Sequence, residues 1–159
     1  MANGLSRDPY KNYRFRVKLG DTYVAGVTKV TGISRKVEPI SFRAGSDDPT
    51  SCPTPGLTSF EPVTLSNGIS KNAEFHNWAS KLNPEGGYAA EDFRKDVTIE
   101  IHDDSGSITD GGTTKRLSYK LLNCWVSEYD ALPDLNAGEN QLAVQTIILQ
   151  HEGFIKEYN

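Results

Sequence analysis

Apolar and polar side chains alternate along most of this chain, and this period of two restricts it to a mainly β fold. Residues 13–19 show the pattern well, because aromatic and aliphatic side chains take every second position. Cations occupy the positions between them, at Arg14, Arg16 and Lys18. Such alternation is typical of a strand with one buried face and one face that meets solvent, a partner subunit or a solvent-filled lumen.

Further alternating segments predict that strands dominate the chain. They cover residues 22–33, 34–43, 63–68, 97–101, 117–126 and 141–152. In the first of these, Gly26 and Gly32 indicate a bulge or a close backbone approach, and Pro39 indicates an edge or a bulge in the second. The segments 97–101 and 117–126 are expected to pair as a hairpin.

The last of these strands is predicted to be the longest, and both of its faces are apolar. One face carries Leu142, Val144 and Ile148, and the other carries Ala143, Ile147 and Leu149. A strand of this kind is either central in a sandwich or covered on its second face by another chain. This strand therefore favours a protein that assembles with copies of itself.

One helix and one proline-rich segment interrupt the strands. Apolar residues at i, i+3, i+4 and i+7 predict a helix over residues 72–83, with Asn72 as its N-cap. These apolar residues are Phe75, Trp78, Ala79 and Leu82. Residues 45–62 contain four prolines, so we expect an extended loop without helix or strand. A loop of this length is either disordered or used on a partner.

Length and composition set further limits. The 159 residues suit a single domain with a proper core, and 36% hydrophobic residues exclude wholesale disorder. Residues 1–8 are polar, so we expect a flexible N-terminus without a signal peptide, and no apolar run is long enough to span a bilayer. Synthesis in a cytoplasm is therefore expected. The net charge of −4 gives no general attraction for nucleic acid.

The sequence predicts no catalytic, cofactor-binding or metal-binding residue. The histidines His76, His102 and His151 lack the spacing of a zinc site. Asp103, Asp104 and Asp110 lack the order of a calcium-binding loop. Cys52 and Cys124 are expected to be reduced structural thiols, and Trp78 and Trp125 to be core residues. No nucleophile elbow, phosphate-binding loop or dinucleotide fingerprint is present, which argues against an enzyme.

Several segments follow one another in a characteristic order. They are residues 13–17 with the stretch 25–33, residues 63–68 with the later Trp78, residues 119–125, and residues 135–140 leading into 143–154. In order and spacing they resemble the tail tube proteins of contractile phages and the inner tube proteins of phage-tail-like contractile injection systems. The resemblance covers about Pro9 to Phe154. Val27 and Gln145 depart from the family, which usually has a bulkier aromatic and an acidic residue at these positions.

The resemblance implies an antiparallel β-sandwich or barrel with a flanking helix, whose subunits close into six-membered rings that stack into a rigid tube. It implies a homo-oligomer whose partners are a sheath protein, baseplate or spike proteins and a tube terminator. The lumen would hold an effector protein or DNA, and sheath contraction would drive the tube through a target envelope. The particle would be cytoplasmic, membrane-anchored or released, and made in a bacterial or phage-infected cell.

Two groups of residues are expected to serve the assembly. Contacts between rings are expected from the long loop, at Gly45, Ser46, Asp47, Asp48, Pro55, Gly56 and Leu57. Ring contacts or the lumen lining are expected from two strands, at Arg14, Arg16, Lys18, Gln145, Ile147 and Leu149.

Three alternatives remain open. A secreted ring-forming carrier of the same fold would house effectors in its lumen, and a tube-initiating paralogue would form only the first ring on a baseplate. From a different class, a monomeric β-sandwich module would bind carbohydrate or peptide, with Trp125 and nearby tyrosines as its platform.

Overall fold

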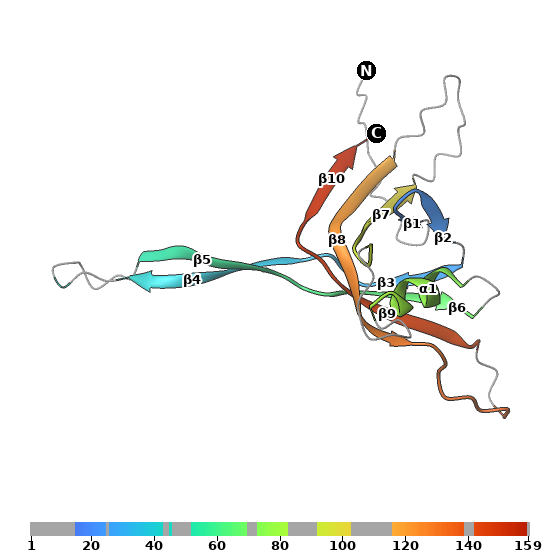
Figure 1. Ribbon diagram of the computed structural model, residues 1–159. Helices are drawn as coiled ribbons and strands as arrows, with labels where there is room; N and C mark the ends of the chain where they lie inside the picture. Colours follow the sequence, from blue (N-terminus) through green and yellow to red (C-terminus); the bar gives the residue numbers. More distant parts are fainter. Residues whose placement is uncertain are drawn as a thin grey trace, which may run out of the picture.

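Antiparallel strands make up most of the protein, and one short helix flanks them (Figure 1). This computed structural model describes residues 15–24, 26–42, 45, 52–69, 73–82, 92–102, 116–138 and 142–158. The elements are β1 (Phe15–Leu19), β2 (Thr22–Val24), β3 (Val27–Val30), β4 (Arg35–Phe42), β5 (Cys52–Phe60), β6 (Val63–Gly68), α1 (Glu74–Ser80), β7 (Lys95–His102), β8 (Arg116–Asp130), β9 (Val144–Gln150) and β10 (Phe154–Tyr158).

The long strand β8 joins two layers of sheet. Strands follow the order β2-β1-β7-β8-β9-β6-β3, and β10 also pairs with β8. The first part of β8 pairs with β7 and β10, whereas its residues 125–130 pair with β9. We call β2, β1, β7, β10 and the first part of β8 the first layer. The second layer comprises residues 125–130 of β8 with β9, β6 and β3.

Backbone hydrogen bonds fix the corner at which β8 passes between the layers. Asn123 has a φ of 50°, an uncommon value outside glycine. Beside it, the Leu122 N–H donates to the Gly153 carbonyl at 2.9 Å, and the Glu152 N–H donates to the Leu122 carbonyl at 3.0 Å. The turn between β9 and β10 therefore bends together with β8.

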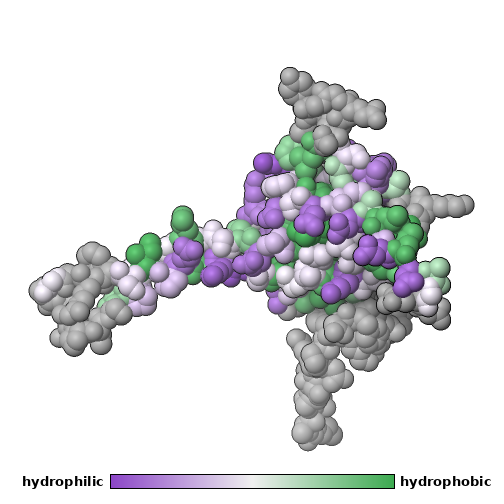
Figure 2. All heavy atoms as spheres, turned by 90° about the horizontal axis from the view of Figure 1, so that it is seen from below, coloured by the Kyte–Doolittle hydropathy of each residue, from purple (hydrophilic) through white to green (hydrophobic). Residues whose placement is uncertain are grey.

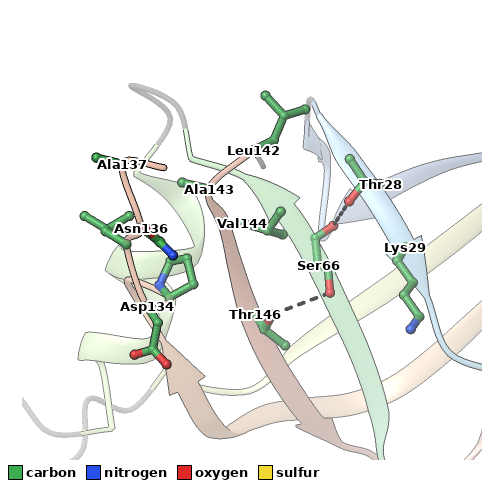
Figure 3. Close-up of a pocket in the computed structure, with 12 residues that line it drawn as sticks. Thr28, Lys29, Ser66, Asp134, Asn136, Ala137, Leu142, Ala143, Val144 and Thr146 are labelled. Carbon is green, nitrogen blue, oxygen red and sulfur yellow. Dashed lines mark hydrogen bonds between the residues drawn. The ribbon is translucent and has the colours of Figure 1, made fainter. Parts of the chain in front are cut away.

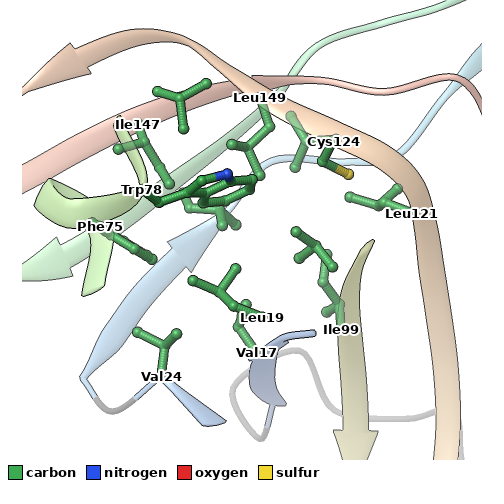
Figure 4. Close-up of a cluster of buried hydrophobic side chains, with 14 residues drawn as sticks. Val17, Leu19, Val24, Phe75, Trp78, Ile99, Leu121, Cys124, Ile147 and Leu149 are labelled. Carbon is green, nitrogen blue, oxygen red and sulfur yellow. The ribbon is translucent and has the colours of Figure 1, made fainter. Parts of the chain in front are cut away.

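The hydrophobic core lies between the two layers and under α1 (Figure 4). Val17 and Ile99 enter it from the first layer, and Leu65 and Ile147 enter it from the second. The helix adds Phe75 and Trp78, and the Trp78 indole N–H donates to the Phe93 carbonyl at 2.7 Å. The prediction that Trp78 is a core residue is therefore confirmed, whereas Trp125 is only partly buried.

The predicted mainly β, antiparallel fold with one flanking helix is confirmed, and so is the pairing of β7 with β8. The helix is shorter than the predicted 72–83. Ala73 precedes its first turn without a side-chain capping bond, so the prediction of Asn72 as N-cap is wrong. The longest strand is β8, not the predicted 141–152, because β9 covers only residues 144–150. The C-terminal strand β10 was not predicted.

The predicted loop 45–62 is wrong for much of its length, because residues 52–60 form β5. This strand pairs with β4, so that Pro55 faces Pro39 and Pro53 faces Ser41. Proline differs from other residues in lacking the backbone N–H group. A strand that has a partner on one side only does not need N–H groups on its unpaired side, so it tolerates proline. We call β4 and β5 the ribbon. It extends away from the two layers (Figure 1).

Several other predictions fall on residues outside the described ranges. These are the flexible segment 1–8, Arg14, the contact residues Ser46, Asp47 and Asp48, and the aspartates 103, 104 and 110. Among the described residues, no helix is both long enough and apolar enough to cross a membrane.

Candidate assembly surfaces

The ribbon exposes apolar side chains that no other described element covers. Val37, Ile40 and Leu57 are 42%, 56% and 79% exposed. Figure 2 shows hydrophobic surface along the ribbon at a distance from the two layers. An isolated two-stranded ribbon is marginally stable in water. This surface is therefore a candidate for contact with another chain.

Aromatic and hydrogen-bond contacts anchor the base of the ribbon to the body. The Phe60 ring lies 5.4 Å from His151 and 6.2 Å from Phe154, measured between ring centroids. The two ring nitrogens of His151 lie 3.0 Å from the Glu61 carbonyl and 3.2 Å from the Gly153 carbonyl. His151 thus binds the base of the ribbon to the corner between β9 and β10.

Four of the residues predicted to join rings are described, three of them in β5 of the ribbon and Gly45 in a turn after β4. Gly45, Pro55 and Leu57 are exposed, whereas Gly56 is partly buried. A β-carbon at Gly56 would lie 2.7 Å from the Glu38 carbonyl oxygen and 2.9 Å from Ile40. Gly56 therefore serves the ribbon itself, because it lets β4 and β5 approach at the bulge between Val37 and Pro39.

The outward face of the first layer is densely charged. Its cross-strand rows are Arg16, Glu100, Ser118 and Glu157, followed by Lys18, Thr98, Lys120 and Ile155. Ion pairs on or beside this face stay within the subunit: Lys120 with Asp96 at 3.3 Å and Arg94 with Glu152 at 3.1 Å. Arg16 and Lys18 lie here, so their expected role in the lumen or ring contacts stays a prediction.

The outward face of the second layer carries no charge on its two central strands. From β6 it presents Thr64 and Ser66, and from β9 it presents Val144, Thr146, Ile148 and Gln150. The Ser66 and Thr146 hydroxyl oxygens lie 3.5 Å apart (Figure 3). Charges on this face sit on the edge strands instead, at Lys29 of β3 and at Glu128 and Asp130 of β8.

A hollow of about 740 Å³ lies between this face and the segment 133–137. Figure 3 shows Asp134 and Asn136 on one side of it and Ser66 and Thr146 on the other. Leu142, at its rim, is 90% exposed. The mixture of hydroxyl groups and uncovered leucine suits contact with a polypeptide better than a tight small-molecule site.

Gln145, Ile147 and Leu149 do not lie on this face, and their expected role in ring contacts or the lumen lining stays a prediction. All three are buried in the subunit, and the Tyr129 hydroxyl donates to the Gln145 side-chain oxygen at 3.1 Å. Because strand side chains alternate, these three positions lie on the core face of β9 and not on its outward face. The sequence analysis singled out none of the charged residues on this face, Lys29, Glu128 and Asp130, because only the strand order shows where they lie.

The described residues contain no group of three or more histidine, cysteine, aspartate or glutamate side chains that would hold a metal ion. The thiols of Cys52 and Cys124 are both free, as predicted, with Cys52 exposed and Cys124 buried. Burial raises the pKa of the Cys124 thiol to about 12. A backbone hydrogen bond with Val97 has the opposite, smaller effect of lowering this pKa. Cys124 is thus a core residue rather than a nucleophile.

Comparisons with known proteins agree with this arrangement. The family model described as T4-like virus tail tube protein gp19 matches residues 11–155. No curated protein matches the chain. Solved structures share its fold, among them a chain of the PVC extracellular contractile injection system in its sheath-tube complex, extended state. That chain has 23% identity and a TM-score of 0.76, with 96% of this chain and 93% of that one covered.

Two further solved structures are similar. A chain of the anti-feeding prophage tube terminating cap has 25% identity and a TM-score of 0.77, covering 96% of this chain and 93% of its own. Hcp1 from Flavobacterium johnsoniae is more distant, with 11% identity and a TM-score of 0.52, covering 91% of this chain and 94% of its own.

Proposed function

The chain belongs to the T4-like virus tail tube protein gp19 family, and we propose that it is the repeating subunit of the inner tube of a contractile tail or contractile injection particle. Its role is structural. Subunits close into hexameric rings, and the rings stack into a conduit that a contracting sheath drives through a target envelope. The observation that carries this proposal is the family match over residues 11–155.

The ribbon supports the stacking step. Its exposed Val37, Ile40 and Leu57 have no cover within the described chain, and its length carries them away from the two layers. A neighbouring ring would bury these side chains and stabilise a ribbon that is marginal alone. The other residues of the ribbon would then contact the neighbouring ring together with the predicted contact residues, Gly45 to Asp48 and Pro55 to Leu57.

The partners and the setting follow from the same proposal. The outside of the tube meets a sheath, and its ends meet a baseplate or spike and a terminator. The similar structures come from a sheath-tube complex and from a tube terminating cap, which supports these partners. The lumen accepts an effector protein or DNA. We further propose that residues 1–159 act as one domain without catalytic activity.

Shortening the ribbon tests the proposal. Residues 37–58 are replaced by Asn-Gly, which closes the Lys36–Ser59 pair with a two-residue turn and removes Val37, Ile40 and Leu57. Purified wild-type chain is expected to form rings and tubes in negative-stain images, whereas the shortened chain forms rings that do not stack. Its thermal unfolding should match the wild type, because none of the described residues that are removed belongs to the core.

Each other outcome points to a different protein. Wild-type rings that never stack would favour the ring-forming carrier or the tube-initiating paralogue. A wild-type chain that stays monomeric at high concentration in light scattering would favour the binding module. Long tubes from the shortened chain would show that the ribbon does not form the contact between stacked rings.

A further inference from the structure

His151 contacts the base of the ribbon and the corner of the body with the two nitrogens of its ring. Nε2 lies 3.0 Å from the Glu61 carbonyl oxygen, and Nδ1 lies 3.2 Å from the Gly153 carbonyl oxygen. The residue is only 9% exposed, so the ring is largely closed off from water. Glu61 follows β5, and its N–H donates to the carbonyl of Ser34, which precedes β4, at 3.2 Å. The ring therefore connects the base of both ribbon strands to the body.

Both polar partners of the His151 ring are hydrogen-bond acceptors. A backbone carbonyl oxygen can only accept, whereas a neutral imidazole has one N–H group and one bare nitrogen. A neutral ring would therefore donate to one carbonyl and direct a nitrogen lone pair at the other. The doubly protonated ring donates to both, and hydrogen bonds from a charged donor are the stronger ones. The Gly153 carbonyl also accepts from the Leu122 N–H at 2.9 Å, which fixes it within the corner.

The surroundings of the ring contain charged groups, but among the described residues none of them forms an ion pair with His151. The Glu152 carboxylate is bonded instead by Arg94 at 3.1 Å and by the Asn123 side-chain nitrogen at 2.9 Å. The Phe60 ring covers His151, with 5.4 Å between the ring centroids. The titratable or charged side chains on the elements around the ring are Arg35 and Glu61 at the ribbon base, Glu152 and Arg94 at the corner, and Tyr119 beside Phe154.

We infer that His151 is a proton-dependent pin that sets the direction of the ribbon relative to the body. With two ring protons, His151 bonds the ribbon base and the corner at the same time. With one ring proton it donates to only one of the two carbonyl oxygens, and the ribbon base becomes free to swing about the corner. The pin is a property of the single subunit and goes beyond the proposed function. Where rings stack as proposed, a ribbon of fixed direction would lose less conformational freedom on binding.

The ring N–H signals of the wild-type chain test the two bonds directly. In ¹⁵N-histidine spectra at about pH 5, His151 should show two ring N–H signals that are protected from exchange with water, whereas the exposed His76 shows none. At about pH 9, His151 should keep only one of its two signals. The His151→Phe chain identifies the signals that belong to His151. A single protected signal at the lower pH would mean that the ring makes one bond, and the inference would be wrong.

A distance measurement tests the swing of the ribbon. The exposed Cys52 pairs with Phe42 at the outer end of the described ribbon, and Asp21→Cys places a second thiol at an exposed turn of the body. The buried Cys124 stays unlabelled. Double electron–electron resonance between nitroxides at these two sites measures the spread of ribbon directions, in labelled chain diluted with unlabelled chain. The spread should widen roughly twofold from about pH 5 to about pH 9.

His151→Phe and His76→Phe are the matched pair of variants for this measurement. Phenylalanine at 151 keeps a ring but removes both donors, so the spread should be wide and equal at the two pH values. His76→Phe should follow the wild type, because His76 packs on Tyr129 of the body and not on the ribbon. Circular dichroism checks that each variant folds, and the wild-type spectra decide the inference even if His151→Phe does not.

Two further results would overturn the pin. An equal spread at both pH values in the wild type would show that the ribbon is not released, and a pH-dependent spread in His151→Phe would show that other groups move it. All of these measurements are made on single subunits. A wild-type chain that forms no tubes would therefore defeat the proposed function and leave the pin standing.

Discussion

The body of the protein and its ribbon are both antiparallel β structure, but they are stabilised in different ways. In the body, Leu121 is fully buried among side chains from both layers. In the ribbon, Leu57 is 79% exposed, and β4 and β5 pair only with each other. The body therefore holds its shape within one chain, whereas the cover that the ribbon lacks would come from the proposed stacking of rings.

The largest expected difference between the two regions is the reactivity of their cysteines, with Cys52 in the ribbon and Cys124 in the body. At pH 8 a thiol whose pKa is about 12 is ionised to about one part in 10⁴, and burial also excludes the reagent. Maleimide should therefore label Cys52 within minutes in the folded subunit and leave Cys124 unlabelled until the chain unfolds.

Mass spectrometry of intact protein and of its peptides measures this labelling without any mutation. The same assay on assembled tubes should show Cys52 protected, because stacked rings bury the ribbon. Equal labelling of Cys52 in subunits and tubes would show that the neighbouring ring does not cover this part of the ribbon.

Matched leucine substitutions should show an intermediate effect. Leu121→Ala opens a cavity in the core and should lower the free energy of unfolding by about 2–5 kcal/mol. Leu57→Ala removes an exposed side chain and should change it by less than about 0.5 kcal/mol. Urea unfolding followed by tryptophan fluorescence measures both, and Trp78 in the core reports on the body. A comparable loss from Leu57→Ala would mean that the ribbon is part of the cooperative core.

The strands of the body could be predicted from sequence because most of them have one buried, apolar face and one solvent-facing side. The alternation in residues 13–19 and 97–101 becomes β1 and β7, with Val17, Val97 and Ile99 buried. In β9 both faces are apolar, so alternation alone could not choose which one enters the core. The structure places Ile147 inward and Ile148 outward. The charges of Lys29 and Asp130 could not be placed from sequence, because only the strand order shows that they lie on the outer strands of the second layer.

The ribbon escaped prediction because its composition conflicts with its structure. Pro53 and Pro55 are expected to break a strand, and this expectation is correct for a strand that is paired on both sides. In the ribbon they occupy alternate positions of β5, which has one partner strand. No local pattern distinguishes such a strand from a loop, since its apolar residues have no core to face.

The smallest expected effect comes from Gly56, which tests whether the ribbon and the body behave separately. In Gly56→Ala the new β-carbon would lie 2.7 Å from the Glu38 carbonyl oxygen, so β4 and β5 must separate at their bulge. Amide hydrogen exchange should then become faster in residues 35–42 and 52–59, while the amides of β7 and β8 keep their protection. The melting temperature should stay within about 2 °C of the wild type, since little core area changes.

Gly68→Ala is the control, because a β-carbon there meets no atom within 4 Å. Faster exchange throughout β7 and β8 in Gly56→Ala would mean that the two regions unfold as one unit.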